Sequence, residues 1–222
     1  MARFNIAVAA LVAFVALTSL AGADSGPMNG ELRSIESNWA RIVFQLQNSD
    51  EQEKQLRSLA RVAEKIAADY PDRAEPLIWE AIITSSEAKY AGAFSALGLA
   101  KRARDLFEKA GRIDYQALDG AVPTSLGALY YMVPGFPLGF GDDDRARQYL
   151  EQGIRISPDG LDSNFYYGDF LFRQGEYAKA AAVLKHALVV PADPDRPIWD
   201  AGRRAEIRAL LTKVDEKLAS LR

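Results

Sequence analysis

Cysteine is absent from the 222-residue sequence, and histidine occurs only once, at position 186. Without cysteine the chain has no thiol nucleophile, no thiolate metal ligand, no disulfide and no thiol for bacterial lipidation. His186 has no serine or carboxylate at a telling spacing, so we expect a surface or groove-edge histidine rather than a general base. A nucleophile elbow and a phosphate-binding glycine loop are missing too. We therefore expect a protein that works by binding, without a cofactor, and not an enzyme.

The sequence also lacks a large excess of charges of one sign, and it has no pattern typical of β-strands. The formal net charge is −3 at pH 7, which argues against nucleic acid as a partner. No alternating run of β-branched residues bounded by turns occurs, so we expect an all-α fold. The length and the 49% of hydrophobic residues suffice for one domain with a sizeable core.

The one long apolar run lies at the N-terminus. Arg3 precedes an apolar stretch over residues 6–20, and Ala21-Gly22-Ala23 has the small-x-small pattern of a cleavage site. We expect a secretory signal peptide over residues 1–23. The alternative is an uncleaved membrane anchor, for which the run is short compared with the ~20 residues of a span. Export without a lipidation cysteine predicts a periplasmic protein.

Downstream, we expect a flexible leader over residues 24–30 and a single helical domain over residues 31–222. Apolar residues in this domain recur at intervals of three and four, the spacing of one helix face. Segments 91–100 and 133–141 contain glycine and interrupt the pattern. We expect both to be enlarged turns between paired helices, the first with the alternative of a helical turn of its own. The expected helices cover residues 31–47, 50–70, a segment from about 75, 101–112, 121–132, 142–156, a pair within 161–190, and 198–221, the last capping the stack.

Residues 161–194 carry the clearest pattern. Two short helices meet at the turn Gln174-Gly175-Glu176, where Gly175 can adopt the left-handed conformation. Such a pair cannot bury its apolar face alone and needs a neighbour on each side, as in a stacked repeat. The segment resembles a tetratricopeptide repeat, which implies stacked helix hairpins in a short α-solenoid. The matching positions are Gly168, Leu171, Gly175, Tyr177, Ala180, Leu184 and Ala187.

The same spacing recurs one repeat earlier. Pro158 lies ten residues before Gly168, where the proline that closes a preceding repeat is expected. Gly127 and Ala146 are 19 residues apart, whereas Gly168 and Ala180 are 12 apart. The earlier repeat therefore has 7 extra residues, which fall in the turn between its helices. Its matching positions are Leu126, Gly127, Tyr130, Ala146, Leu150 and Gly153.

Residues 126–171, from LGALYYMVPGFPLGFGDDDRARQYLEQGI to ISPDGLDSNFYYGDFL, also resemble a narrower family. They are similar to the T-component family of tripartite periplasmic (TRAP) transporters, and the resemblance extends over about residues 76–211. It implies a protein partner, the solute receptor of a TRAP transporter, together with self-association and a hydrophobic ligand channel. The lipobox cysteine of some members is missing here. A protein-interaction module is therefore the expected function, and a binder of a small hydrophobic ligand enclosed by aromatic loops is the alternative.

Two surfaces are candidate sites for the partner or an apolar ligand. Loop 133–141 contains two prolines and three glycines, and its apolar side chains would either bind something or complete the core. The groove positions of the repeat family form the second surface, unless the last helix covers them. The candidate residues are Phe136, Leu138 and Phe140 in the loop, and Tyr131, Phe165, Asp169, Phe172 and Arg173 in the groove.

Asp142, Asp143 and Asp144 follow this loop directly. Hard cations bind several oxygen ligands, but three consecutive carboxylates are poorly placed to converge on one ion. Acidic residues at a helix N-terminus instead accept hydrogen bonds from free N–H groups and suit the helix dipole. We therefore expect these residues to begin a helix and expect no metal site.

Overall fold

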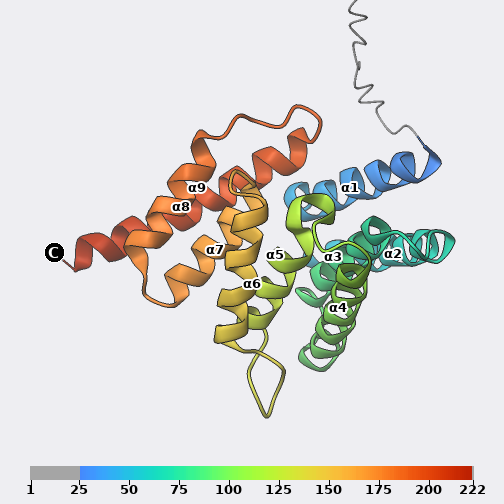
Figure 1. Cartoon of the computed structure of the whole chain (residues 1–222), viewed down its shortest axis with the longest axis horizontal. Helices are drawn as coiled ribbons and strands as arrows, with labels where there is room; N and C mark the ends of the chain where they lie inside the picture. Colours follow the sequence, from blue (N-terminus) through green and yellow to red (C-terminus); the bar gives the residue numbers. More distant parts are fainter. Residues whose placement is uncertain (1–25, 222) are drawn as a thin grey trace, which may run out of the picture.

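The computed structural model describes residues 26–221, except for the side chains of residues 93 and 94, so the expected signal peptide lies outside the described residues. Every regular element within residues 26–221 is a helix, which confirms the all-α prediction (Figure 1). The helices are α1 (Pro27–Gln45), α2 (Ser49–Asp69), α3 (Ala74–Ala88), α4 (Ala93–Ile113), α5 (Ala117–Met132), α6 (Asp143–Ile156), α7 (Leu161–Arg173), α8 (Tyr177–Val189) and α9 (Pro197–Ser220).

Consecutive helices pack in pairs, and the pairs stack. The pairs are α1 with α2, α3 with α4, α5 with α6, and α7 with α8. The first helices of neighbouring pairs also touch, because α3 contacts both α1 and α5, and α5 contacts α7. This arrangement confirms the predicted stack of helix hairpins, in which each pair buries its apolar stripe against the next.

Gly127 in α5 and Gly168 in α7 occupy equivalent places in two successive hairpins. A β-carbon added at Gly127 would lie 2.6 Å from Leu150 Cγ in α6, and one added at Gly168 would lie 2.6 Å from Leu184 Cδ2 in α8. Both distances are far below the ~3.5–4.0 Å of carbon–carbon contact, so glycine permits the close approach of the two helices. The shared contact agrees with the repeat spacing found in the sequence.

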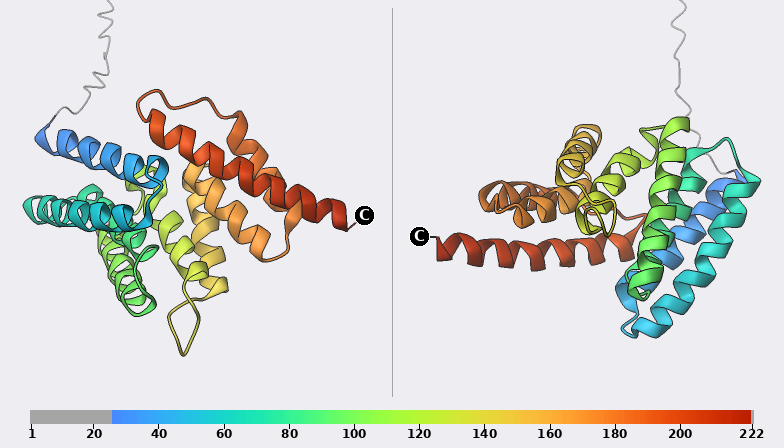
Figure 2. Two further views of the ribbon diagram at one scale, coloured as in Figure 1. Left: turned by 180° about the vertical axis from the view of Figure 1, so that it is seen from behind. Right: turned by 90° about the horizontal axis from the view of Figure 1, so that it is seen from below.

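Helix α9 caps the stack as expected, because it packs on α7 and α8, but it also contacts α1. The start of α9 lies near the end of α1 (Figure 2). Gly202 faces Phe44 so closely that an added β-carbon would lie 2.3 Å from Phe44 Cγ. Arg196, just before α9, pairs with Glu36 of α1 at 3.3 Å. Helix α9 therefore connects the last hairpin of the stack, through α7, back to the first hairpin, through α1.

Two expected boundaries were wrong. Residues 93–100 are not an enlarged turn but the first turns of α4. A β-carbon added at Gly98 would meet no atom within 4 Å. Helix-forming alanines and leucines outweigh the glycines here. Helix α1 begins at Pro27, inside the expected leader, because Pro27 suits the first helical turn and the buried Met28 contributes to the core.

The first residues of α5 have an unusual backbone. Leu118, Asp119 and Gly120 have φ angles of 50°, 54° and 75°, all in the left-handed region. The dipeptide Asp119-Gly120 is typical of a turn, and the regular part of α5 begins after it, at Ala121. A leucine in this conformation is strained, because its β-carbon approaches the following carbonyl oxygen.

Candidate functional site

Loop 133–141 connects α5 to α6 and projects from one side of the stack, at the lower edge of Figure 1. We call these residues the finger. Backbone hydrogen bonds hold its shape: Gly141 N donates to Pro134 O at 2.9 Å, and Leu138 N donates to Gly135 O at 3.1 Å. Asp142 N donates to Tyr130 O at 2.8 Å and ties the finger to α5. The Phe136–Pro137 peptide bond is cis.

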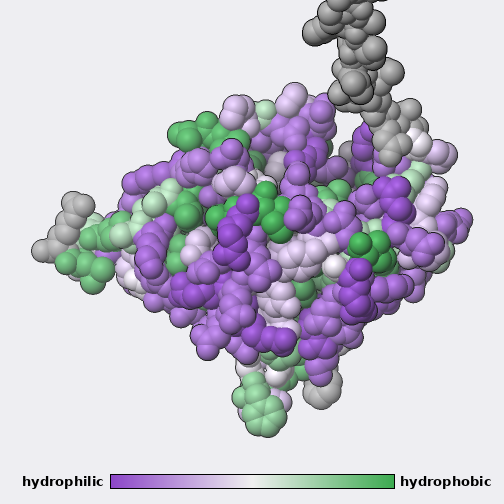
Figure 3. All heavy atoms as spheres, viewed as in Figure 1, coloured by the Kyte–Doolittle hydropathy of each residue, from purple (hydrophilic) through white to green (hydrophobic). Residues whose placement is uncertain are grey.

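The tip of the finger is apolar and faces solvent (Figure 3). Phe136 is 94% exposed and Leu138 is 73% exposed. The alternative in which these side chains complete the core is therefore wrong for both residues. It holds for Phe140, which is half-buried and packs edge-on against Tyr130 with ring centroids 5.5 Å apart. The structure thus divides the three predicted loop residues into one anchor and two exposed side chains.

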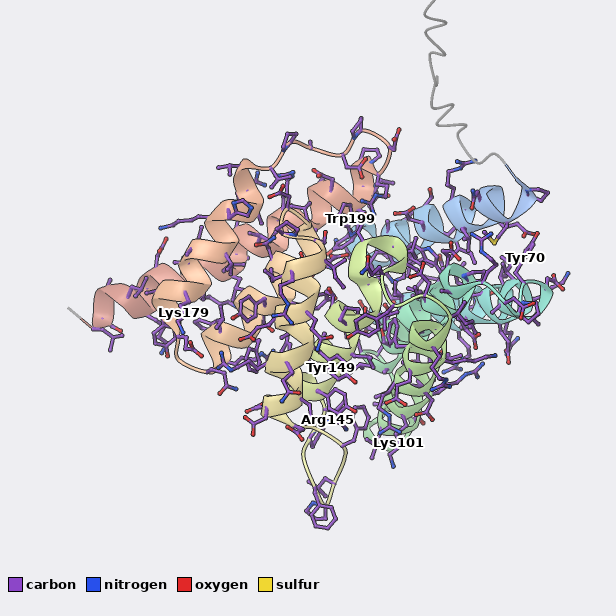
Figure 4. The ribbon with its side chains drawn as sticks, viewed as in Figure 1. Tyr70, Lys101, Arg145, Tyr149, Lys179 and Trp199 are labelled. Carbon is purple, nitrogen blue, oxygen red and sulfur yellow. The ribbon has the colours of Figure 1, made fainter. Side chains whose placement is uncertain are left out.

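Aromatic and arginine side chains support the base of the finger. The buried Tyr130 stacks on Tyr149 of α6 at 5.6 Å, and burial raises the pKa of its hydroxyl. Arg104 of α4 lies 4.6 Å from the centre of the Phe140 ring, and Arg145 of α6 lies 4.8 Å from that of Tyr130. Figure 4 shows Arg145 and Tyr149 directly above the finger. The base is therefore packed and hydrogen-bonded, while the tip has no contact that would hold it in a core.

Three of the predicted groove residues come together between α5 and α7. The Tyr131 hydroxyl donates to Asp169 Oδ2 at 2.9 Å, and Arg173 Nε donates to the same oxygen at 3.0 Å. The Arg173 guanidinium also lies 5.2 Å from the centre of the Tyr131 ring. Burial, and then the nearby Asp169 carboxylate, raise the pKa of Tyr131 well above its usual range. These contacts join two hairpins and leave the arginine half exposed.

The other two groove residues are not free to line a groove. The buried Arg203 of α9 lies 4.5 Å from the centre of the Phe165 ring, and its Nε lies 2.6 Å from Asp162 Oδ1 in an ion pair. The alternative, that the last helix covers this surface, is therefore correct for Phe165. Phe172 is half-buried and packs against Tyr177 of α8 with ring centroids 5.6 Å apart. Closure of the stack by α9 therefore explains the covered position of Phe165, whereas Phe172 is covered within its own hairpin by α8.

Asp142, Asp143 and Asp144 begin α6 as predicted. Asp142 is the N-cap and accepts a hydrogen bond from Arg145 N at 3.0 Å. Within residues 26–221, no group of three or more histidine, aspartate or glutamate side chains is arranged to hold a metal ion. His186 is exposed, as expected, and its Nε2 lies 2.8 Å from Asp159 Oδ1.

Two hollows in the described part of the chain are open and partly polar, and finger residues line neither of them. One runs along the charged face of α2. The other, of about 280 Å³, lies between α1, α3 and the start of α5. Sequence reasoning missed this second hollow, although the break at Asp119-Gly120 marked its edge. Its lining residues are Asn29, Leu32, Arg33, Glu36, Arg73, Glu75, Trp79 and Leu118.

Comparison with protein-family models and with curated proteins finds no match for this chain. Among the described residues, no helix combines the length and the apolar character that a membrane span requires.

Proposed function

We propose that this chain is a protein-interaction module that docks on a partner protein through the finger. The observation that carries the proposal is the exposure of Phe136 and Leu138 at the tip of a hydrogen-bonded loop. Burying such side chains against a partner contributes about 1.5–3 kcal/mol each. Aromatic anchors of this kind commonly dominate the energy of protein interfaces. Because backbone hydrogen bonds already order the finger, little conformational entropy is lost when it binds a partner.

A small hydrophobic ligand enclosed by the loop is favoured less. An enclosing site is concave and buries most of its ligand, whereas Phe136 and Leu138 face solvent and finger residues line neither of the two hollows described above. Among the described residues, no serine, threonine or lysine is hydrogen-bonded to the cluster of Tyr131, Asp169 and Arg173. The Tyr131–Asp169 bond joins α5 to α7 and the Arg173–Asp169 bond lies within α7, so the proposal is binding without catalysis.

The resemblance to the T-component family supports a choice of partner. Residues 126–171, which carry the closest resemblance, include the whole finger. The proposed partner is accordingly the solute receptor of a TRAP transporter. We propose that the chain reaches this receptor in the periplasm, to which the signal peptide over residues 1–23 directs it. The tetratricopeptide-like spacing of two successive hairpins agrees with this proposal, because that family serves as a scaffold for protein contacts.

The test is capture of a partner from periplasmic extract with the purified, tagged protein. The wild type is compared with a finger variant that carries Phe136→Ala and Leu138→Ala, and with Val189→Ala as a matched control. Val189 is 77% exposed but lies at the end of α8, away from the finger. We expect the wild type and the control to recover a solute receptor and the finger variant to lose it. Equal recovery by the finger variant, or no receptor with the wild type, would contradict the proposal.

A further inference from the structure

Helices α1 to α4 and helices α5 to α9 form two halves of the molecule. In the right-hand view of Figure 2, α1 to α4 gather on one side and α6 to α8 on the other. Among the described residues, helices of the two halves touch in only two regions. In one region α5 packs on α3 and α4, and in the other α9 packs on α1. The halves are therefore joined along α5 and, separately, through α9.

The chain crosses from the first half to the second once, through the first residues of α5. Leu118, Asp119 and Gly120 there have φ angles of 50°, 54° and 75°. Leucine is strained in this left-handed conformation, and a change in its φ and ψ would release the strain. Hinges are short segments that absorb such changes, and strained backbone is typical of segments that switch between two states. These three residues therefore have the properties of a hinge.

The contact between α1 and α9, which we call the clasp, lies away from this hinge in the sequence and is tight. A β-carbon added at Gly202 would lie 2.3 Å from Phe44 Cγ. The Arg203 guanidinium lies 5.7 Å from the centre of the same ring. Just before α9, Arg196 Nη1 pairs with Glu36 Oε1 at 3.3 Å. The clasp thus combines one aromatic contact with charged side chains from both halves.

The clasp keeps charged groups away from water at a cost. Burial raises the pKa of Glu36 despite its pairing with Arg196, and the carboxylates of Asp193 and Asp162 raise it as well. Arg203 Nε and Asp162 Oδ1 lie 2.6 Å apart, yet among the described residues these are the two buried side-chain atoms without a hydrogen-bond partner. Separating α1 from α9 would let water reach these groups, which offsets part of the apolar contact that is lost.

We infer that the two halves swing apart about residues 118–120 when the clasp opens. The closed form is the one in the structure, with α9 against α1. In the open form the strain at Leu118 is released, and Phe44 on one half and Arg203 on the other become accessible. This change needs neither the finger nor its partner, because it involves only the helices of the stack. A protein that binds either uncovered surface would select the open form and raise its population.

The test measures distances between pairs of spin labels by pulsed electron paramagnetic resonance. The chain has no cysteine, so two introduced cysteines are the only sites that carry labels. The spanning pair joins the halves through Val62→Cys in α2 and Val189→Cys in α8, at residues that are 48% and 77% exposed. The reference pair lies within the second half and combines Val189→Cys with Met132→Cys at the end of α5.

Two clasp variants and one control are compared with the wild type. Gly202→Ala pushes α9 away from Phe44, whereas Gly98→Ala adds its β-carbon where no atom lies within 4 Å. Arg196→Gln removes the positive charge that faces Glu36, at a partly exposed position that should tolerate the change. We expect the spanning pair to gain a longer distance, with a fraction about fivefold or more above wild type in Gly202→Ala. That fraction should also rise in Arg196→Gln and stay at the wild-type value in Gly98→Ala.

Adding Leu118→Gly to Gly202→Ala tests the hinge. Glycine adopts the left-handed conformation without strain, so the closed form gains and the longer-distance fraction should fall about fivefold. The reference pair should keep one distance throughout. A spanning pair with one unchanged distance in both clasp variants, or no effect of Leu118→Gly, would overturn the inference. A reference pair that changes as much as the spanning pair would indicate unfolding in place of a hinge motion and would overturn it as well.

Discussion

Replacing Gly202 by alanine should destabilise the protein, although the same change at Gly98 should stabilise it. Both glycines lie inside helices, where alanine is favoured over glycine by about 0.5–1 kcal/mol. At Gly98 nothing lies within 4 Å of the added β-carbon, so only this gain remains. At Gly202 the added carbon would lie 2.3 Å from Phe44 Cγ and 2.9 Å from Phe44 Cβ. The ring, and with it the contact between α9 and α1, would have to move.

The magnitude follows from these two effects. Overpacking of this kind costs about 1–3 kcal/mol, which exceeds the helix-propensity gain. The expected net loss for Gly202→Ala is therefore about 1 kcal/mol. For a chain of this length, 1 kcal/mol corresponds to about 2–4 °C in the midpoint of thermal unfolding. The two alanine variants should thus differ by about 3–8 °C, with the wild type between them.

Circular dichroism at 222 nm, followed as a function of temperature, measures both midpoints under identical conditions. A Gly202→Ala protein as stable as Gly98→Ala would refute the tight contact between α9 and α1. It would also remove the reason given for the covered position of Phe165.

Two further predictions concern charge and backbone strain. Burial raises the pKa of Glu36 above its ordinary 4.5 despite the pairing with Arg196. The stability that protonated Glu36 contributes is therefore full below pH 4.5, and it is lost as the pH rises through the pKa of Glu36 in the folded protein. In thermal unfolding, the midpoint of the wild type should therefore fall relative to that of Glu36→Gln as the pH is raised from 4.5 to neutral. A difference between the two midpoints that stays constant over this pH range would contradict the prediction. Leu118→Gly should raise the free energy of unfolding in urea by up to about 1 kcal/mol, because glycine relieves the left-handed strain; a loss of stability would count against strain at this position.

Local patterns were sufficient to predict most of the fold. The turn at Gly175 has the expected positive φ of 77°, and Gly127 and Gly168, which the repeat spacing placed at equivalent positions, both make close helix contacts. The long turn after α5 was located by counting residues between equivalent positions. These features depend on neighbours within one hairpin, so the sequence carries a direct signal for them.

Long-range features could not be predicted in the same way. The contact between Phe44 and Gly202 joins distant parts of the chain and leaves no periodic signal. Whether a phenylalanine in a loop is buried or exposed depends on the surrounding surface, which is why Phe136 and Phe140 differ although both lie in one glycine-rich segment. The hollow beside Leu118 arises where three helices meet, and none of its residues stands out in its own segment.

Site-specific cross-linking tests the role of the finger most directly. A photoreactive phenylalanine analogue is placed at position 136, and at position 189 as the exposed control, and the cells are irradiated. We expect a cross-link from position 136 to a solute receptor and none from position 189. A receptor cross-linked from position 189 and not from position 136 would contradict docking through the finger.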